Sequence, residues 1–191
     1  MKHSKTFYIV NGITIYRLSA APVLFGMVLM HEVELFKWFL LLSFSTDAID
    51  GFLARRWKVT SATGARLDSI ADDLTVMVAT VALFISQTKF VFANASWFIV
   101  PLILFVVQMI IAFAKYGKIT SFHTYAAKVA ALAQGLFLLS AFFFEQPNYY
   151  LMIAAAVVTT YDLVEEIILA LLIKEWITDV KGIWWIFRKK S

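Results

Sequence analysis

Residues 46–73 read TDAIDGFLARRWKVTSATGARLDSIADD and contain five aspartates together with four arginine or lysine residues. This charge lies in a chain that is 61% hydrophobic and only 16% charged, with a mean hydropathy of +0.79. Soluble domains are about half apolar and about a quarter charged. Charged groups at membrane depth are costly and are usually retained for function. The stretch therefore predicts a functional site if it lies inside a membrane.

The hydrophobic segments predict an integral membrane protein. Apolar runs about as long as a membrane helix recur along the whole chain of 191 residues. We expect an all-α fold, a single domain over residues 1–191, with six transmembrane helices around a polar cavity open to the cytoplasm. The expected helices cover residues 8–30, 33–56, 64–88, 94–115, 121–145 and 149–174. No cysteine is present, which excludes disulfides and thiolate metal sites.

The positive charges predict the orientation of the helices. Four of them surround the second loop, namely Arg55, Arg56, Lys58 and Arg66. The loops on the opposite side contain only Lys37 and Lys89. Cationic loops stay in the cytoplasm, so we expect a multi-pass protein of the inner (cytoplasmic) cell membrane with both termini in the cytoplasm. The net charge of +4 suits anionic membrane lipids rather than nucleic acid, because no basic soluble domain is present.

The two ends of the chain are interpreted differently. Residues from about 175 to 191 are expected to form a basic interfacial tail, with Trp184 and Trp185 at the level of the lipid headgroups. The N-terminus begins with basic residues, but Asn11, Thr14 and Arg17 interrupt its apolar run. We therefore do not expect a cleaved signal peptide there.

Four of the five aspartates fall on two helical stripes. At about 100° per residue, Asp47 and Asp50 share one face of the second expected helix, and Asp68 and Asp72 share one face of the third. Asp73 lies about 140° from Asp68 and leaves the stripe. Small or hydroxyl residues lie beside the carboxylates on the same stripes, at Gly51, Ala54, Gly64 and Thr75. Two neighbouring helices are thus expected to present two carboxylates each.

Further charges fall at a similar depth in the expected helices. They are Arg17, Lys128, Asp162, Glu165 and Glu166. Charges from five helices in one layer predict the polar, cytoplasm-facing cavity. The pattern assigns no individual role to Arg17 or to the three acidic residues of the last helix.

The carboxylate stripes predict a site for divalent metal ions. Four facing carboxylates cannot all remain ionised in a low-dielectric site without cations. A ligand set made only of oxygen suits Mg²⁺ or Mn²⁺, and two ions about 4 Å apart bind phosphate oxygens well. Arg55, at the cytoplasmic rim, is placed for a bidentate contact with a phosphate.

Other interpretations of the acidic residues are weaker. The aspartates could be structural partners of Arg17 and Lys128, or the proton or sodium sites of an ion-coupled transporter. A transporter predicts inverted repeats and broken helices, which the sequence does not show. A lipid phosphatase needs a set of nucleophilic and cationic side chains that His3, His31 and His123 do not form.

Written with its spacing, the motif is Asp47-x2-Asp50-Gly51-x2-Ala54-Arg55-x8-Gly64-x3-Asp68-x3-Asp72. It resembles the signature of the CDP-alcohol phosphatidyltransferase family at every position. Asn11-x2-Thr14-x2-Arg17 resembles the N-terminal element of that family, which helps to hold the CDP group. Because the number of expected helices and the chain length also match compact prokaryotic members, the resemblance covers nearly the whole chain.

The resemblance implies a reaction and its residues. A hydroxyl acceptor attacks the lipid-bearing phosphate of CDP-diacylglycerol or a similar CDP-lipid, and CMP leaves. Asp47, Asp50, Asp68 and Asp72 would bind two Mg²⁺ or Mn²⁺ ions, and Asp72 would also be the general base. The implied contacts with the CDP-lipid are Asn11, Thr14, Gly51, Ala54, Arg55, Ser61 and Gly64. The resemblance also implies a homodimer.

The identity of the acceptor alcohol stays open between glycerol 3-phosphate and another small alcohol or phospho-alcohol. The candidate groups for binding an acceptor phosphate are Arg66, Lys115, Lys118, His123 and Lys128. The chain has Ser69 and Asp73 where glycerol-3-phosphate enzymes of the family commonly have proline and lysine, and it lacks a second lysine after Lys118. Lys128 is equally well interpreted as a partner of Glu165 or Glu166. His123 is also interpreted as a capping or interfacial residue at the start of a helix.

Overall fold

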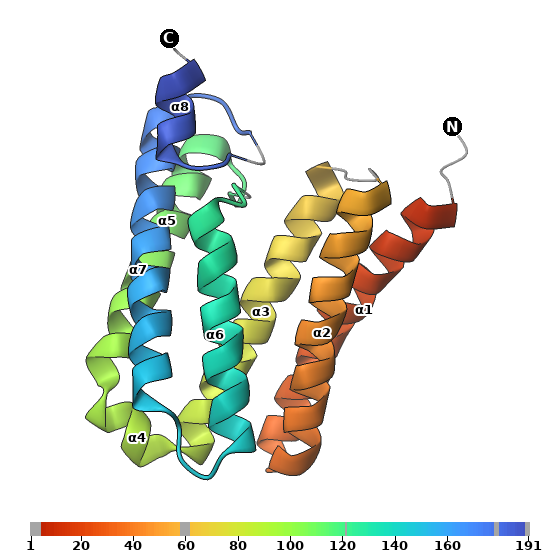
Figure 1. Ribbon diagram of the computed structural model, residues 1–191, viewed down its shortest axis with the longest axis vertical. Coiled ribbons are helices and arrows are strands. Elements are labelled where there is room, and N and C mark those ends of the chain that lie inside the picture. The colour runs from red at the N-terminus through yellow and green to blue at the C-terminus, as the bar shows by residue number, and fades with distance from the viewer. Residues whose placement is uncertain (1–4, 58–61, 121, 178–179, 190–191) are drawn as a thin grey trace. The chain divides into compact units, whose positions relative to one another are not determined.

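The computed structural model describes the backbone of residues 5–57, 62–120, 122–177 and 180–189. Side chains are described for residues 16, 18–46, 49, 67, 70–120, 122–177 and 180–186. The described residues are mostly helical and contain no strand, which confirms the all-α prediction (Figure 1). The helices are α1 (Lys5–Leu29), α2 (Val33–Trp57), α3 (Ala62–Ser86), α4 (Thr88–Ala93), α5 (Ala95–Tyr116), α6 (Tyr125–Phe143), α7 (Tyr149–Leu172) and α8 (Ile183–Lys189).

The long helices coincide with the expected ones, and the differences lie at their ends. The fifth expected helix was placed from residue 121, but α6 begins at Tyr125. Thr124 is its N-cap, and the side-chain oxygen of Thr124 accepts a hydrogen bond from the Ala127 amide at 2.9 Å. The short helix α4 follows α3, and the C-terminal tail contains α8.

Two of the long helices are sufficiently long and apolar to cross a membrane. Among the described residues these are α5 and α6, and Leu18–Leu29 in α1 forms a shorter apolar segment. The other long helices contain charged residues, as in α7, where Asp162, Glu165 and Glu166 fall within two turns. The arrangement of six transmembrane helices around a cavity stays a prediction.

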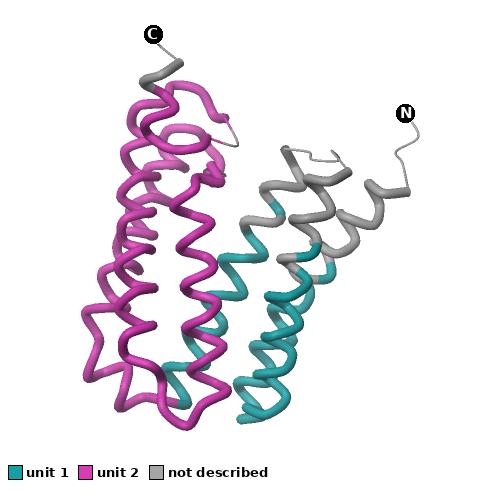
Figure 2. The backbone as a smooth tube through the Cα atoms, viewed as in Figure 1, with its two compact units in different colours: residues 1–86 teal, residues 87–191 magenta. Residues whose placement is uncertain are grey.

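The chain divides into two compact units, residues 1–86 and residues 87–191 (Figure 2). In unit 1, α1 packs against both α2 and α3, and α2 also contacts α3. In unit 2, α7 packs against α5 and α6 and contacts α8, and α4 contacts α5. The prediction of a single domain over the whole chain is not tested by this division.

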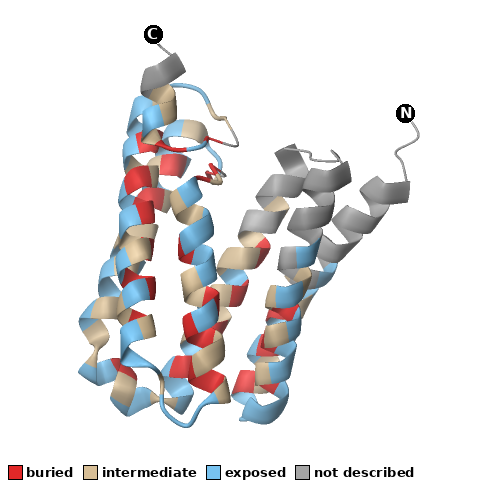
Figure 3. Cartoon of the chain, in the orientation of Figure 1, coloured by how far each residue is buried: buried red, intermediate tan, exposed pale blue. Residues whose placement is uncertain are grey.

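The core of unit 1 is formed by one face of each of its helices (Figure 3). The buried positions recur every three or four residues, as expected for a helix with one face turned inward. They are Ala21, Leu24 and Val28 in α1, Phe36, Leu40 and Ser43 in α2, and Ala71, Thr75, Ala79, Ala82 and Leu83 in α3. The aspartates of the motif follow directly on from this buried series.

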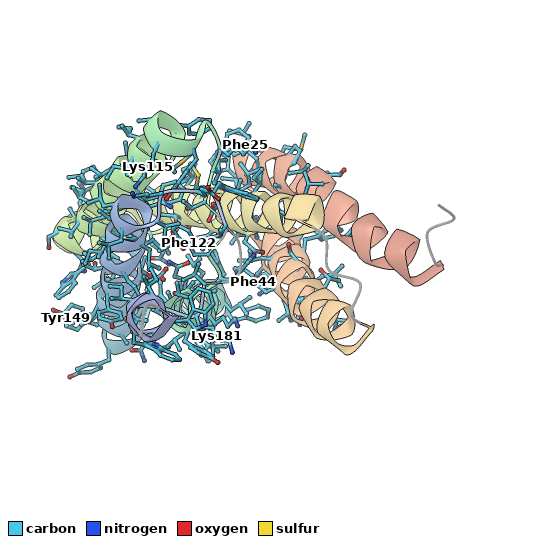
Figure 4. The ribbon with its side chains drawn as sticks, turned by 90° about the horizontal axis from the view of Figure 1, so that it is seen from above. Phe25, Phe44, Lys115, Phe122, Tyr149 and Lys181 are labelled. Atoms are coloured by element: carbon cyan, nitrogen blue, oxygen red, sulfur yellow. The ribbon has the colours of Figure 1, made fainter. Side chains whose placement is uncertain are left out.

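The core of unit 2 extends to its C-terminal segment. Phe122, labelled in Figure 4, is fully buried with Leu169, Ala170 and Val180. Ile183, Trp185 and Ile186 of the C-terminal segment pack against this cluster, whereas Trp184 is 52% exposed. The two adjacent tryptophans therefore have different environments, and the interfacial tail stays a prediction.

Candidate active site

The four aspartates of the motif lie on two continuous helices. Asp47 and Asp50 belong to α2, and Asp68 and Asp72 belong to α3. An uninterrupted helical backbone is what the prediction of shared faces requires. The side chains of Asp47, Asp50 and Asp68 lie outside the described residues. The side chains of Asp72 and Asp73 are described, and both are half-buried.

The positions of the aspartates continue the buried faces of their helices. In α2 the buried residues Phe36, Leu40 and Ser43 are spaced by four and three residues, and the same spacing leads on to positions 47, 50 and 54. In α3, Asp68 and Asp72 precede the buried residues Thr75 and Ala79 by two helical turns. Asp73 stands in the same relation to Thr80, which is only half-buried. The burial pattern thus supports the prediction that the four aspartates face the interior of unit 1.

The two pairs of aspartates also lie at matching levels. Helices α2 and α3 are joined by the short segment 58–61 and run side by side in opposite directions (Figure 1). Asp47 lies about 15 Å along the axis of α2 from its end at Trp57. Asp72 likewise lies about 15 Å along the axis of α3 from its start at Ala62. Asp50 and Asp68 lie about 10 Å along the same axes. Counted from the loop that joins the helices, each helix therefore has one aspartate at about 10 Å and one at about 15 Å along its axis.

The residues of this region fit divalent metal ions. Four carboxylates supply an all-oxygen ligand set of the kind that Mg²⁺ and Mn²⁺ prefer. A buried hydroxyl without any hydrogen-bond partner, that of Ser43, lies one turn from Asp47 in the same helix. Among the described side chains no group of three or more histidine, cysteine, aspartate or glutamate residues is placed to hold a metal. The side chains of three of the four predicted ligands, Asp47, Asp50 and Asp68, are not among those described.

The predicted contacts with the CDP-lipid all belong to unit 1. Asn11 and Thr14 lie in α1, which packs against both aspartate helices. The other helical contacts are Gly51, Ala54 and Arg55 in α2 and Gly64 in α3. The side chains of these residues, and that of Arg66, lie outside the described residues, as does Ser61 altogether. The fold thus brings the helices of the nucleotide contacts together, and the contacts themselves stay predictions.

The predicted acceptor residues of unit 2 lie around the loop between α5 and α6. Lys118 is exposed, and its Nζ lies 5.2 Å from the centre of the Trp176 ring. His123 is half-buried, and its φ of 52° lies in the left-handed region. Because α6 begins at Tyr125, His123 precedes the helix and Thr124 is the cap. The interpretation of His123 as the capping residue is therefore wrong.

Lys128 and Lys115 both lie near helix ends in unit 2. Lys128 lies in the first turn of α6, where it is exposed, and its Nζ lies 5.3 Å from the centre of the Tyr125 ring. Its expected depth in the helix was too great because the helix starts later. Lys115 Nζ donates hydrogen bonds to the carbonyl oxygens of Ala170 and Leu171 at 2.8 and 2.7 Å. Lys115 thus satisfies the C-terminal carbonyls of α7, where a cation is favoured.

The acidic residues of α7 are used inside unit 2. Asp162 Oδ1 accepts a hydrogen bond from the Thr124 hydroxyl at 3.1 Å, and Glu165 Oε1 accepts one from the Ile183 amide at 3.1 Å. Asp162 and Glu165 are both buried. These carboxylates hold the start of α6 and the start of α8. They were expected in the shared cavity layer, and the sequence did not indicate these structural roles.

Glu166 completes this set of interactions. Its Oε2 accepts a hydrogen bond from Gln108 Nε2 of α5 at 2.9 Å, and Gln108 also donates to the Thr120 hydroxyl. Gln108 is buried in the middle of α5, between apolar residues on both sides. A lone glutamine in such a helix is a signal that could have indicated a buried polar network. With these partners, the alternative that Lys128 pairs with Glu165 or Glu166 loses its support.

Comparison with known proteins identifies the family. The chain matches the model of the CDP-alcohol phosphatidyltransferase family over residues 7–161. The protein belongs to the CDP-alcohol phosphatidyltransferase family. The matched region contains the complete aspartate motif and the N-terminal element around Asn11, and it ends in α7 immediately before Asp162.

Individual relatives of this family member match over shorter regions. The chain is 43% identical over 77 residues to a protein of Cereibacter sphaeroides named CDP-diacylglycerol--glycerol-3-phosphate 3-phosphatidyltransferase, which covers 38% of the chain and 35% of the relative. A protein of the same name from Haemophilus influenzae is 39% identical over 66 residues, covering 35% of the chain and 32% of the relative. The chain thus spans about a third of the length of these curated relatives. No solved structure matches the chain.

Proposed function

We propose that the protein transfers a phosphatidyl group from CDP-diacylglycerol to a small hydroxyl acceptor and releases CMP. Membership of the CDP-alcohol phosphatidyltransferase family supports this reaction class. The names of the relatives from Cereibacter sphaeroides and Haemophilus influenzae support CDP-diacylglycerol as the donor. The observation that carries the proposal is the alignment of the four motif positions with the buried faces of α2 and α3.

Asp47, Asp50, Asp68 and Asp72 are the residues that would hold two divalent ions, Mg²⁺ or Mn²⁺. When bound, such ions supply positive charge against the diphosphate of the CDP-lipid. Arg55 adds a further cation suited to a bidentate phosphate contact. Gly51, Ala54 and Gly64 leave space for the nucleotide to approach the backbone, and Asn11, Thr14 and Ser61 supply polar contacts to it.

Asp72 acts as the general base in this proposal. Its carboxylate takes the proton of the acceptor hydroxyl as the acceptor oxygen forms a bond with the lipid-bearing phosphorus. The bond between that phosphorus and the oxygen of CMP breaks, and CMP leaves with the electron pair. The chain contributes mainly by positioning the reactants and by compensating their charge, as in other phosphoryl transfers.

Glycerol 3-phosphate is the proposed acceptor. The printed names of the relatives support it. Its phosphate requires cationic groups, and the candidates are Arg66, Lys118, His123 and Lys128. We further propose that the protein is a homodimer in the inner membrane, with both termini in the cytoplasm. The distribution of arginine and lysine over the loops supports this orientation.

The test is CMP release by the purified protein from CDP-diacylglycerol, measured with Mg²⁺ or Mn²⁺ and with a panel of alcohols. The panel contains glycerol 3-phosphate, inositol phosphate, serine and choline. We expect metal-dependent CMP release with glycerol 3-phosphate and little with the others. Release with a different alcohol would change the acceptor, whereas no metal-dependent release with any alcohol would contradict the proposed reaction.

A further inference from the structure

Three hydroxyl residues precede Asp47 in α2, and one of them differs from the others. Ser45 Oγ donates a hydrogen bond to the Leu41 carbonyl at 2.7 Å. Thr46 Oγ1 donates to the Leu42 carbonyl at 2.9 Å. Ser43 is only 3% exposed, and its Oγ has no hydrogen-bond partner. Buried polar groups in folded proteins are almost always paired, so an unpaired one calls for an explanation.

The hydroxyl residues of α3 follow the same rule as Ser45 and Thr46. Thr75, Thr80 and Ser86 each donate to the carbonyl four residues earlier, at 2.8 Å. Such local hydrogen bonds are the usual way in which a helical serine or threonine satisfies its hydroxyl. Among the side chains that the structure describes, Ser43 Oγ is the buried polar atom without a partner.

The position of Ser43 connects it with the aspartates. Ser43 is the last described residue in the buried series of α2 before Asp47, and it lies about 6 Å from Asp47 along the helix axis. Its level along α2 corresponds to that of Thr75 in α3, on the side of the aspartates away from segment 58–61. The Thr75 hydroxyl is already used by the Ala71 carbonyl. Ser43 therefore offers a free donor next to the aspartate level.

We propose that Ser43 is a positioning residue of the divalent-metal site and that its hydroxyl donates a hydrogen bond to an oxygen in the coordination shell of the metal. The inference rests on the metal-binding role proposed above. Oxygen ligands of protein-bound metals are themselves hydrogen-bonded by a second layer of groups, which orients them. A hydroxyl donor next to an anionic oxygen forms one of the stronger hydrogen bonds. A metal site at the aspartates would thus give the Ser43 hydroxyl the hydrogen-bond partner that it lacks.

We expect Ser43→Ala to weaken metal binding without lowering the stability of the metal-free protein. We expect the variant to bind Mn²⁺ about 10- to 100-fold more weakly, in the range found for the loss of such second-layer groups. In contrast, the thermal midpoint of the metal-free protein should stay the same or rise, because the variant removes an unpaired buried hydroxyl. Ser45→Ala is the matched control, since Ser45 is exposed and its hydroxyl is paired within the helix. This control should leave the Mn²⁺ affinity unchanged.

The experiment measures Mn²⁺ binding to the purified protein without CDP-lipid, by electron paramagnetic resonance, together with the thermal midpoint without metal. A second pair, Ser43→Thr and Ser43→Val, has equal side-chain volume and differs in the hydroxyl. We expect the threonine variant to bind Mn²⁺ more tightly than the valine variant. Equal Mn²⁺ affinities for that pair, with normal binding by the unchanged protein, would overturn the role of Ser43 alone. Failure of the unchanged protein to bind Mn²⁺ would overturn the metal site itself and this inference with it.

Discussion

The two units of the chain treat their buried polar groups in different ways. In unit 2, the carboxylates of Asp162 and Glu165 accept hydrogen bonds from groups of the chain itself. In unit 1, the described residues include a buried hydroxyl, that of Ser43, that the chain does not pair. This hydroxyl lies beside the aspartates of the family motif. These carboxylates of unit 2 are thus paired within the chain, whereas the Ser43 hydroxyl of unit 1 is, in our proposal, paired at the metal site. The following predictions test this division.

The largest effect is expected for the aspartates of unit 1. Asp47→Asn and Asp68→Asn each remove a negative charge from the proposed metal site. We expect them to reduce CMP release by at least about 100-fold and to abolish metal-dependent binding of the CDP-lipid, because positioning and charge compensation carry most of the catalysis. Paired measurements of CMP release and of CDP-lipid affinity with and without Mn²⁺ check this. A normal metal-dependent affinity for the CDP-lipid in either variant would contradict the proposed metal site of unit 1.

A smaller effect, on stability, is expected at Thr124 of unit 2. The Thr124 side chain caps α6 and donates to Asp162. Thr124→Val leaves the Ala127 amide and a buried carboxylate oxygen without this partner. We expect a loss of about 1–3 kcal/mol in the free energy of unfolding. The free energy is measured by denaturant titration in detergent micelles.

The control for Thr124 is Ser140→Ala in the same helix. The Ser140 hydroxyl donates a hydrogen bond to the Phe137 carbonyl, so this bond stays within α6. We expect a change of less than about 0.5 kcal/mol for this variant. If Thr124→Val unfolded as readily as Ser140→Ala, the structural role of Asp162 would have to be given up.

A further effect on stability is expected at Gly182, just before α8. Gly182 has a φ of +146°, and an added Cβ would come within 3.0 Å of Glu165 Oε1 and of Trp184 Nε1. Gly182→Ala should therefore destabilise the docked C-terminal segment by about 1 kcal/mol or more. Faster proteolytic cleavage of residues 180–189 is the expected readout.

At Gly26 in α1, in contrast to Gly182, we expect an alanine to stabilise the protein. An added Cβ at Gly26 meets nothing within 4 Å, and the residue lies inside a helix. Gly26→Ala should stabilise the protein by about 0.5–1 kcal/mol, because alanine loses less backbone entropy than glycine in a helix. A destabilised Gly26→Ala variant would show that this backbone argument does not hold for the chain.

The sequence predicted the parts of the structure that depend on local periodicity. The long apolar runs located the long helices, and the spacing of Asp47, Asp50, Asp68 and Asp72 predicted two stripes at positions that continue the buried series of α2 and α3. Both signals arise within one helix, from its repeat of about 3.6 residues.

The sequence did not predict features that join distant segments. Phe122 looked like part of a helix because it is apolar, but it packs with Leu169 and Val180, far along the chain. The helix α6 begins only at Tyr125, where Thr124 supplies the cap. The threonine was a local signal for a helix start that the apolar pattern outweighed. The partners of Asp162 and Glu165 were likewise unpredictable, since they lie in other segments.

The most direct test of the account compares Asp72→Asn with Asp73→Asn. The two residues are adjacent in α3 and both are half-buried, so composition and burial do not separate them. Only the helical face does, since Asp72 precedes the buried Ala79 by two turns. The measurement is CMP release together with CDP-lipid affinity for both purified variants. We expect Asp72→Asn to lower CMP release by about 10² to 10⁴-fold, the usual contribution of a general base, while substantial CDP-lipid binding survives. We expect Asp73→Asn to keep most of the activity. Equal loss of activity in two folded variants would contradict the assignment of the site to one face of α3, and near-normal turnover of Asp72→Asn would contradict its role as the base.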